Sequence, residues 1–173
     1  MKPMVEGRAL VLGDNVNTDI LHPSRFYSLD DKKVRSGFLG AVDGRESDGQ
    51  RDLTGAIVLA GENFGIGSSR ETGARVFVLA GVQAIVAASF ARIFYRNVMN
   101  LGLPAVVCPA LAGYRPSDDV VVRLDLISRL LTVSGRQFPI EPWDPHWQRV
   151  CDAGGLAQWL GLSTSTHKAS QDG

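Results

Sequence analysis

The stretch Ile57–Ala80, IVLAGENFGIGSSRETGARVFVLA, joins an apolar run to a glycine-rich turn and then to a helical pattern. Its first four residues show none of the alternation of a half-exposed strand, which indicates a strand buried on both faces, as in a parallel sheet. Beyond the turn, apolar or small residues recur at the three- and four-residue spacing of a helix: Ala74, Phe77, Val78 and Gly81. The stretch therefore predicts one β-α unit.

A second unit of the same kind follows directly. The apolar run Ala84–Ala88 leads through a short turn into a helical pattern whose apolar positions are Phe90, Ile93, Phe94 and Leu101. Two β-α units in succession imply right-handed crossovers within one parallel sheet. We expect two further strands of that sheet at Arg8–Leu12 and Ala105–Cys108.

The pattern changes after Pro116. Three short runs separated by turn residues indicate an antiparallel meander: Val120–Leu124, Leu130–Val133 and Gln137–Ile140. A final short helix is expected at Asp152–Leu162. The chain is thus predicted to be one α/β domain over residues 1–162, with a parallel and an antiparallel part, followed by a polar, disordered tail at 163–173.

Residues 25–54 interrupt this regular order. They are polar, charged and rich in glycine, with one weak helical stretch at Asp31–Leu39. We interpret them as a mobile loop or excursion from the sheet.

Composition narrows the class of protein. The 173 residues are 45% hydrophobic and 21% charged, which suits one domain with its own core. Eighteen basic and eighteen acidic residues cancel, so no global positive field favours a nucleic acid or an anionic membrane. The pair Arg92 and Arg96, four residues apart, is the one feature that favours nucleic acid, and it fits a partner-docking or a solvated face equally. No apolar run approaches the roughly 20 residues of a membrane helix, and we expect a cytoplasmic protein without a membrane segment.

Cysteine and histidine show no ligand spacing. Cys108 and Cys151 are far apart, as are the three histidines, so a metal site held by this chain alone is not expected. We interpret both cysteines as small buried hydrophobes. Trp143 and Trp147, flanked by prolines, are interpreted as packing anchors rather than a ligand platform.

The turn Gly61–Gly73, GENFGIGSSRETG, carries the most chemical information. Gly65 and Gly67 permit positive φ and close approach of a ligand, and Ser68 and Ser69 are good N-cap residues with outward N–H groups. Arg70 adds a forked cation suited to a carboxylate. The alternative is an ordinary helix that Ser68 caps, with Ser69 and Arg70 solvated. The spacing excludes a Walker A loop and a GxGxxG loop.

Two more polar residues follow a strand end. Asp19 comes after the first predicted strand, and Arg25 lies six residues further on. Both are candidates for the same rim of the sheet as the turn at Ser68–Arg70. The alternative for them is an Asx turn and a solvated arginine.

Three segments together resemble a known family. GDNVNTDILHPSRF (Gly13–Phe26), GENFGIGSSRE (Gly61–Glu71) and ASFARIFYRNVMNLGLP (Ala88–Pro104) are similar, in order and spacing, to the small subunits of 3-isopropylmalate dehydratase in the aconitase superfamily. The resemblance spans roughly Gly7 to Leu162. It implies a three-layer β/β/α swivelling domain.

The resemblance also implies an activity, a cofactor and a partner. Members are hydro-lyases that dehydrate and rehydrate a hydroxy dicarboxylic acid, in a heterodimer or heterotetramer with a large subunit. That large subunit holds a 4Fe-4S cluster, so no cofactor is expected on this chain. By motif, Ser68 would be the catalytic base, Ser69, Arg70 and Arg25 would bind substrate carboxylates, and Asp19 would belong to the catalytic polar network.

The resemblance further assigns a specificity loop to Phe26, Tyr27, Ser28 and Leu29. It is apolar with no cation after Arg25, which favours an alkyl substituent and hence 3-isopropylmalate of leucine biosynthesis. Where the common family form reads CGSSREHA, however, this chain has Ile66, Thr72 and Gly73. These departures leave two alternatives open: a paralogue for homoaconitate, 2-methylmalate or dimethylmalate, and a non-catalytic dicarboxylate-binding module.

Overall fold

Strand β1 (Met4–Val11) joins two differently built halves of one sheet. The structure is a computed structural model that describes residues 4–42, 44–45 and 51–162. Its seven strands run in the order β4-β3-β2-β1-β5-β6-β7. The carboxyl half of β1, Ala9–Val11, pairs in parallel with β2 (Ile57–Ala60), and its amino half, Met4–Arg8, pairs antiparallel with β5 (Val121–Asp125).

The parallel half follows the predicted β-α order. Strands β2, β3 (Ala84–Ala87) and β4 (Ala105–Val107) are joined by helices α3 (Thr72–Leu79) and α4 (Arg92–Asn100). Every residue of β2 and β3 is buried, as their unbroken apolar runs predict. The antiparallel half adds β5, β6 (Leu130–Val133) and β7 (Arg136–Pro139), which is the predicted meander.

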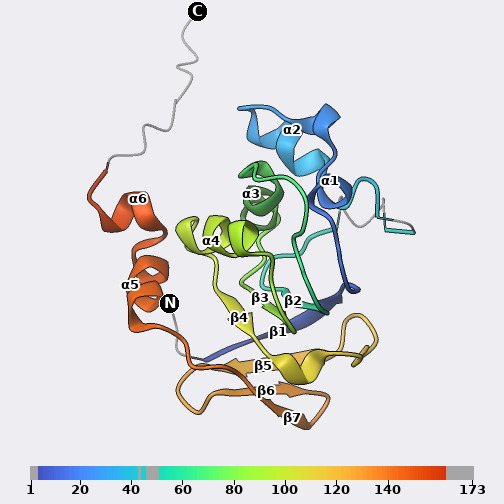
Figure 1. Cartoon of the computed structure of the whole chain (residues 1–173), viewed down its shortest axis with the longest axis vertical. Helices are drawn as coiled ribbons and strands as arrows, with labels where there is room; N and C mark the ends of the chain where they lie inside the picture. Colours follow the sequence, from blue (N-terminus) through green and yellow to red (C-terminus); the bar gives the residue numbers. More distant parts are fainter. Residues whose placement is uncertain (1–3, 43, 46–50, 163–173) are drawn as a thin grey trace, which may run out of the picture.

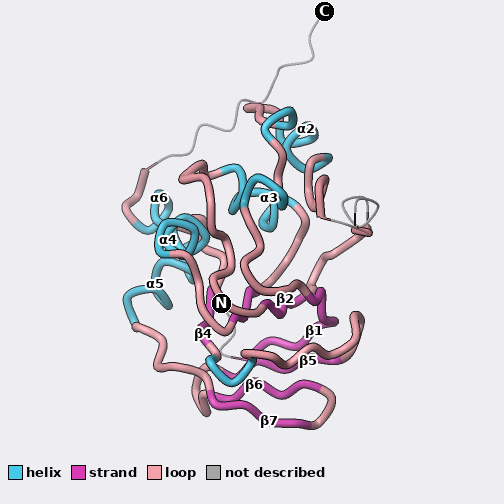
Figure 2. Tube along the Cα trace, turned by 45° about the vertical axis from the view of Figure 1, so that its right-hand side comes forward, coloured by secondary structure: helices cyan, strands magenta, loops and turns pink. Residues whose placement is uncertain are grey.

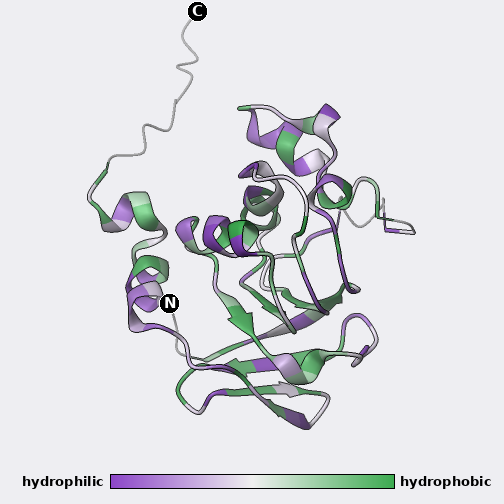
Figure 3. Ribbon diagram, viewed as in Figure 1, coloured by the Kyte–Doolittle hydropathy of each residue, from purple (hydrophilic) through white to green (hydrophobic). Residues whose placement is uncertain are grey.

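The sheet folds over so that its halves face each other. Ile57 and Leu59 of β2 pack with residues of the antiparallel half, such as Val122 and Leu131, while Val58 and Ala60 pack beneath the helices. Figure 1 shows the resulting order, with helices α1–α4 above, the parallel strands in the middle, the antiparallel half below, and the carboxyl-terminal helices at the left side. Apolar residues accordingly gather on the strands in Figure 3. The predicted α/β fold with three β/β/α layers is confirmed.

Two short helical elements lie in the described part of the connection between β1 and β2. They are the 3-10 turn η1 (Ser24–Phe26) and helix α2 (Asp31–Ser36), and α2 lies beyond α3 from the sheet (Figure 2). Val34, Phe38 and Leu39 are fully buried in the helix-side core. The helix expected at Asp31–Leu39 is therefore present in this excursion from the sheet, and Val34 and Phe38, four residues apart, make one apolar face within a charged segment. Positions 43 and 46–50 lie outside the described residues.

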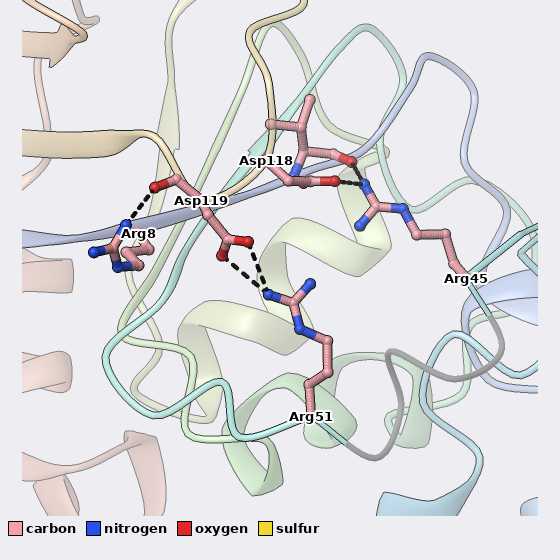
Figure 4. A network of polar contacts seen from close by, with 6 residues as sticks. Arg8, Arg45, Arg51, Asp118 and Asp119 are labelled. Carbon is pink, nitrogen blue, oxygen red and sulfur yellow. Dashed lines mark hydrogen bonds and ion pairs between the residues drawn. The ribbon is translucent and has the colours of Figure 1, made fainter.

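Ion pairs tie this segment back to the sheet. Arg45 Nη2 lies 2.6 Å from Asp118 Oδ2, and Arg51 Nη2 lies 3.0 Å from Asp119 Oδ1. Figure 4 shows both pairs, together with Arg8, which donates to the Asp119 carbonyl. The two aspartates lie in the connection that leads into β5. The ion pairs therefore hold Arg45 and Arg51 against this connection.

The carboxyl-terminal helix is divided, contrary to the single helix expected at Asp152–Leu162. Helix α5 (Pro145–Ala153) ends at Gly154, where φ is 87°, and α6 (Leu156–Trp159) begins after Gly155, where φ is 129°. Positive φ at two successive glycines stops a right-handed helix. The tail expected at 163–173 lies outside the described residues.

The predicted structural roles of tryptophan and cysteine are confirmed. Trp143 packs against both cores and Trp147 against the helix-side core. Cys108 and Cys151 are free and buried, in different cores, and burial raises the pKa of the Cys151 thiol to about 12. Within the described ranges no helix is long and apolar enough to cross a bilayer.

An aromatic cluster on the helix side gives a test of this core. The Phe77 ring centroid lies 4.9, 6.0 and 6.1 Å from those of Phe38, Phe64 and Phe94. We expect Phe77→Ala to lower the free energy of unfolding by about 3–5 kcal/mol, measured by urea denaturation. Ile127→Ala is the control, because that side chain is 77% exposed and its loss should be nearly neutral. A loss below about 1 kcal/mol for Phe77→Ala would contradict the packing described here.

Candidate active site

Three loops meet at the carboxyl edge of the parallel strands. The loop after β1 bridges the turn after β2 through Asn17 and Ile66, and the turn after β2 bridges the turn after β3 through Phe64 and Phe90. Backbone hydrogen bonds reinforce both junctions, such as that from Thr18 N to Ile66 O at 2.7 Å. The three motif segments of the sequence are therefore neighbours in space. Ligands of parallel α/β sheets bind at such an edge.

Two glycines set the shape of the turn after β2, as predicted. Gly65 has a φ of 84° and Gly67 a φ of 109°. A Cβ on Gly65 would lie 2.1 Å from Phe94 Cγ, and one on Gly67 would lie 2.3 Å from Asn17 Oδ1. Only glycine satisfies both the backbone angle and the close packing at these positions.

Ser68 is held in the turn by its backbone and its hydroxyl. Its N–H donates to Thr18 Oγ1 at 2.8 Å, and its Oγ accepts from Arg70 N at 3.1 Å. Helix α3 begins at Thr72, with Glu71 in the N-cap position and no side-chain cap bond. The N-cap role expected of Ser68 and Ser69 is therefore wrong, because a local turn over Ser68–Arg70 separates these serines from the helix.

Ser69 lies beside helix α4. Its carbonyl accepts from Asn97 Nδ2 at 3.2 Å, and its side chain is exposed. Arg92 and Arg96 are also exposed on α4. The second and third motif segments thus touch at Ser69 as well as at Phe64.

Arg70, Asp19 and Tyr27 form one cluster. Arg70 Nη2 lies 2.8 Å from Asp19 Oδ1, and Tyr27 Oη donates to the same oxygen at 3.3 Å. The guanidinium carbon of Arg70 lies 4.4 Å from the Tyr27 ring centroid. Burial raises the pKa of Tyr27, and this effect outweighs the contact with Arg70, which lowers that pKa. The Arg70 and Asp19 side chains are 50% and 51% exposed, so this polar cluster is open to a ligand.

Local structure explains how Asp19 reaches this cluster. Asp19 is in the first turn of α1 (Thr18–Leu21), and its N–H donates to the side chain of Asn17, the N-cap residue. The Asx turn weighed for this segment exists, but Asn17 forms it. The Asp19 carboxylate is left to face Arg70 across a separation of 51 residues in sequence.

Arg25 has other contacts. Its Nη2 donates to Gly40 O at 3.1 Å, and its guanidinium carbon lies 4.7 Å from the Phe26 ring centroid. Arg25 is exposed in η1, so the structure places it on the same loop as Tyr27 but bonds it to the α2 side.

The four loop residues Phe26–Leu29 are not equivalent. Phe26 is half-buried and occupies the space that a Cβ on Gly37 would need. Ser28 Oγ accepts from Asp30 N at 3.0 Å. Leu29, at 95% exposure, is the side chain of this loop that extends furthest into solvent.

Thr18 and His22 also support this site, and the sequence did not predict either of them. His22 is fully buried, its ring stacks on Tyr27 with centroids 5.5 Å apart, and its Nε2 lies 2.9 Å from Val34 O. Burial lowers the pKa of His22, which keeps the imidazole neutral, although the Val34 carbonyl partly opposes this. Neither residue carries a recognisable chemical pattern. The signal for Thr18 was its place next to Asp19.

The structure shows the surroundings of the three residues that differ from the family form. A Cβ on Gly73 would lie 3.3 Å from Thr18 Cβ and 3.4 Å from its Cγ2, so glycine lets α3 approach α1 closely. Ile66 acts here through its backbone, whose carbonyl bonds Thr18 N. Thr72 Oγ1 is buried without a hydrogen-bond partner among the described residues.

Metal-ligating side chains do not converge. Among residues 4–42, 44–45 and 51–162, no group of three Cys, His, Asp or Glu side chains is placed to hold an ion. The two thiols lie in separate cores on opposite faces of the parallel strands. These residues do not fit an iron–sulfur cluster, which needs converging thiolates.

Comparisons with known proteins agree on one family. The model of the aconitase C-terminal domain matches residues 15–110. The chain is similar to the 3-isopropylmalate dehydratase small subunit of Moorella thermoacetica (35% identity over 94% of this chain and 98% of that protein). It is also similar to small subunit 1 of Thermotoga maritima (34% identity, 91% and 95%). A crystal structure of 3-isopropylmalate dehydratase from Methanocaldococcus jannaschii superposes with a TM-score of 0.82 at 31% identity, covering 91% of this chain and 93% of that one.

The bond between Thr18 and Ser68 can be tested by an isosteric change. Thr18→Val leaves the Ser68 N–H without its acceptor in a site where Thr18 is 3% exposed, so we expect a loss of about 1–3 kcal/mol in the free energy of unfolding. Thr72→Val is the matched control, since its hydroxyl has no partner, and should be neutral or stabilising. Equal losses for both variants in chemical denaturation would show that the Thr18 hydroxyl has no special role.

Proposed function

The chain belongs to the family of 3-isopropylmalate dehydratase small subunits, which are aconitase-superfamily hydro-lyases that work with a large subunit. We propose that this chain contributes Ser68 and Arg70 to the active site that the two subunits share. The observation that carries this proposal is the cluster of Ser68, Arg70 and Asp19 on an open edge where three loops meet. A half-exposed cluster of this kind suits a site that a second chain completes.

Ser68 is the proposed base. Its Oγ would take the proton from the carbon next to a substrate carboxylate. A serine hydroxyl is a very weak acid, so its alkoxide needs stabilisation. The Arg70 N–H already donates to this oxygen at 3.1 Å, and a hydrogen bond to the charged form favours that form. Exclusion of water by the large subunit would strengthen this bond further.

Arg70 is the proposed carboxylate ligand, together with Ser69. A guanidinium has five N–H donors, and the contact with Asp19 leaves others available for a substrate oxygen. Asp19 acts by holding the cation on the correct side of the turn. Arg25, on the neighbouring loop, is proposed to bind the second carboxylate.

The cofactor and the substrate complete the proposal. A 4Fe-4S cluster on the large subunit would supply a Lewis acid for the substrate hydroxyl. The described residues of this chain do not themselves fit a cluster. Leu29 is the exposed apolar side chain of the specificity loop, and residues 26–29 include no cation. We therefore propose 3-isopropylmalate, with its alkyl substituent, rather than an acid with a third carboxylate.

The direct experiment is to co-purify the chain anaerobically with its large subunit and to measure iron and turnover of 3-isopropylmalate by absorbance of the unsaturated product. Recovery of an iron-bearing large subunit together with turnover is the expected result. Recovery of the chain alone, under conditions that preserve a known complex, would favour a stand-alone dicarboxylate-binding module. Turnover of homoaconitate or 2-methylmalate, without turnover of 3-isopropylmalate, would show that the substrate is one of those acids instead.

Substitution of the base is the first test within that complex. We expect Ser68→Ala to lower kcat about 10²–10⁴-fold while the complex still assembles, because the proton acceptor is removed. Ser36→Ala is the control, since that hydroxyl bonds Lys33 O within α2. Turnover by Ser68→Ala near the wild-type rate would eliminate Ser68 as the base.

A second test addresses the carboxylate ligand. Arg70→Lys keeps the charge but loses the fork, so we expect KM to rise about 10–100-fold, the effect of losing one charge-assisted hydrogen bond. Arg123→Lys is the matched control, because Arg123 also pairs with a half-exposed carboxylate, Glu6, but on the antiparallel half. A KM that changes equally in both variants would argue against a role for Arg70 in binding.

A further inference from the structure

We propose that Tyr27 is a positioning residue, which fixes the Arg70 guanidinium in the orientation that receives the substrate carboxylate. This inference rests on the proposed function and refines it. The family resemblance placed Tyr27 in a loop that meets the variable part of the substrate, whereas its side chain contacts Arg70, Asp19 and His22.

Both parts of the Tyr27 side chain are engaged. The ring lies under the guanidinium of Arg70, 4.4 Å from ring centroid to guanidinium carbon. The hydroxyl donates to Asp19 Oδ1 at 3.3 Å, the same oxygen that Arg70 contacts at 2.8 Å. One side chain therefore orients the cation by its ring and the partner carboxylate by its hydroxyl.

The Tyr27 ring is itself held from the protein interior. It stacks on His22 with an interplanar angle of 21°, and His22 is fully buried with Nε2 2.9 Å from Val34 O of α2. The Tyr27 N–H also donates to Ser24 O at 3.0 Å. A continuous series of contacts thus runs from helix α2 through His22 and Tyr27 to Arg70.

The exposure of Arg70 explains why such support matters. A half-exposed ion pair holds a long side chain only weakly, because solvent screens the attraction and many rotamers compete. An aromatic face that binds the guanidinium plane removes part of that freedom before the substrate arrives. The gain should therefore be in substrate binding rather than in the chemical step.

The test uses the assembled enzyme and three variants. Tyr27→Leu removes the ring and the hydroxyl, Tyr27→Phe removes only the hydroxyl, and Tyr114→Leu is the matched control. Tyr114 packs against the core between the two halves of the sheet, and an arginine also lies over its ring. The guanidinium carbon of Arg136 is 5.3 Å from the Tyr114 ring centroid.

We expect Tyr27→Leu to raise KM about 3- to 30-fold, the fold-change of losing one cation–π contact, with kcat within about twofold of wild type. Tyr27→Phe should show a smaller rise, and Tyr114→Leu none. An unchanged KM for 3-isopropylmalate in Tyr27→Leu, or a fall in kcat with no change in KM, would overturn the proposal.

A second readout does not depend on turnover. The Arg70 Nε–H resonance of the labelled chain, assigned by its loss in Arg70→Lys, should show an upfield ring-current shift that Tyr27→Phe keeps and Tyr27→Leu loses. If the wild-type complex fails to turn over 3-isopropylmalate, the proposed substrate fails while this measurement still decides the Tyr27 contact. Absence of the shift in the wild type overturns the inference. Tyr27→Met serves in place of Tyr27→Leu should the latter fail to fold.

Discussion

The dual pairing of β1 is the constraint on which the rest of the molecule depends. One continuous strand bonds β2 in parallel through Ala9–Val11 and β5 in antiparallel fashion through Met4–Arg8. Because the two halves share this strand, the sheet can fold over on itself and bury both faces of β2. The carboxyl ends of the parallel strands then remain free at one edge, and that edge is where the polar cluster lies.

The cluster is built mostly from backbone geometry. Gly65 and Gly67 have positive φ and lie against Phe94 and Asn17, which sets the path of the chain into Ser68. The buried hydroxyl of Thr18 then holds the Ser68 N–H. Side-chain chemistry is added last, by an arginine and an aspartate that solvent can reach. Precision in this site thus comes from buried, rigid parts, while the reactive groups stay accessible to another chain.

Much of the fold could be predicted from the sequence, since uniform apolar runs and helical spacing depend on local physics. The parallel strands, the meander and the turn after β2 are examples. The helix at Asp31–Leu39 was predicted, but the burial of its apolar residues was not, because Val34 and its few apolar neighbours are outnumbered by charges in the sequence. The break at Gly154 was missed although the sequence carries its signal, because two successive glycines favour positive φ and end a helix. The sequence predicted that Asp19 and Arg70 lie on the same rim of the sheet. It did not predict the contributions of His22 and Tyr27, because these depend on tertiary contacts across two loops.

The close approach of α3 to α1 limits how this turn can evolve. Alanine at position 73 would press on Thr18, whose Cβ and Cγ2 lie 3.3 and 3.4 Å from the added atom. Removing the Thr18 hydroxyl to make room would release the Ser68 N–H. Serine at position 18 keeps the acceptor and removes the Cγ2 methyl, although Cβ stays, so it lessens the crowding without releasing the Ser68 N–H. Positions 18 and 73 are therefore coupled, and a side chain at 73 is best accommodated together with a smaller hydroxyl residue at 18.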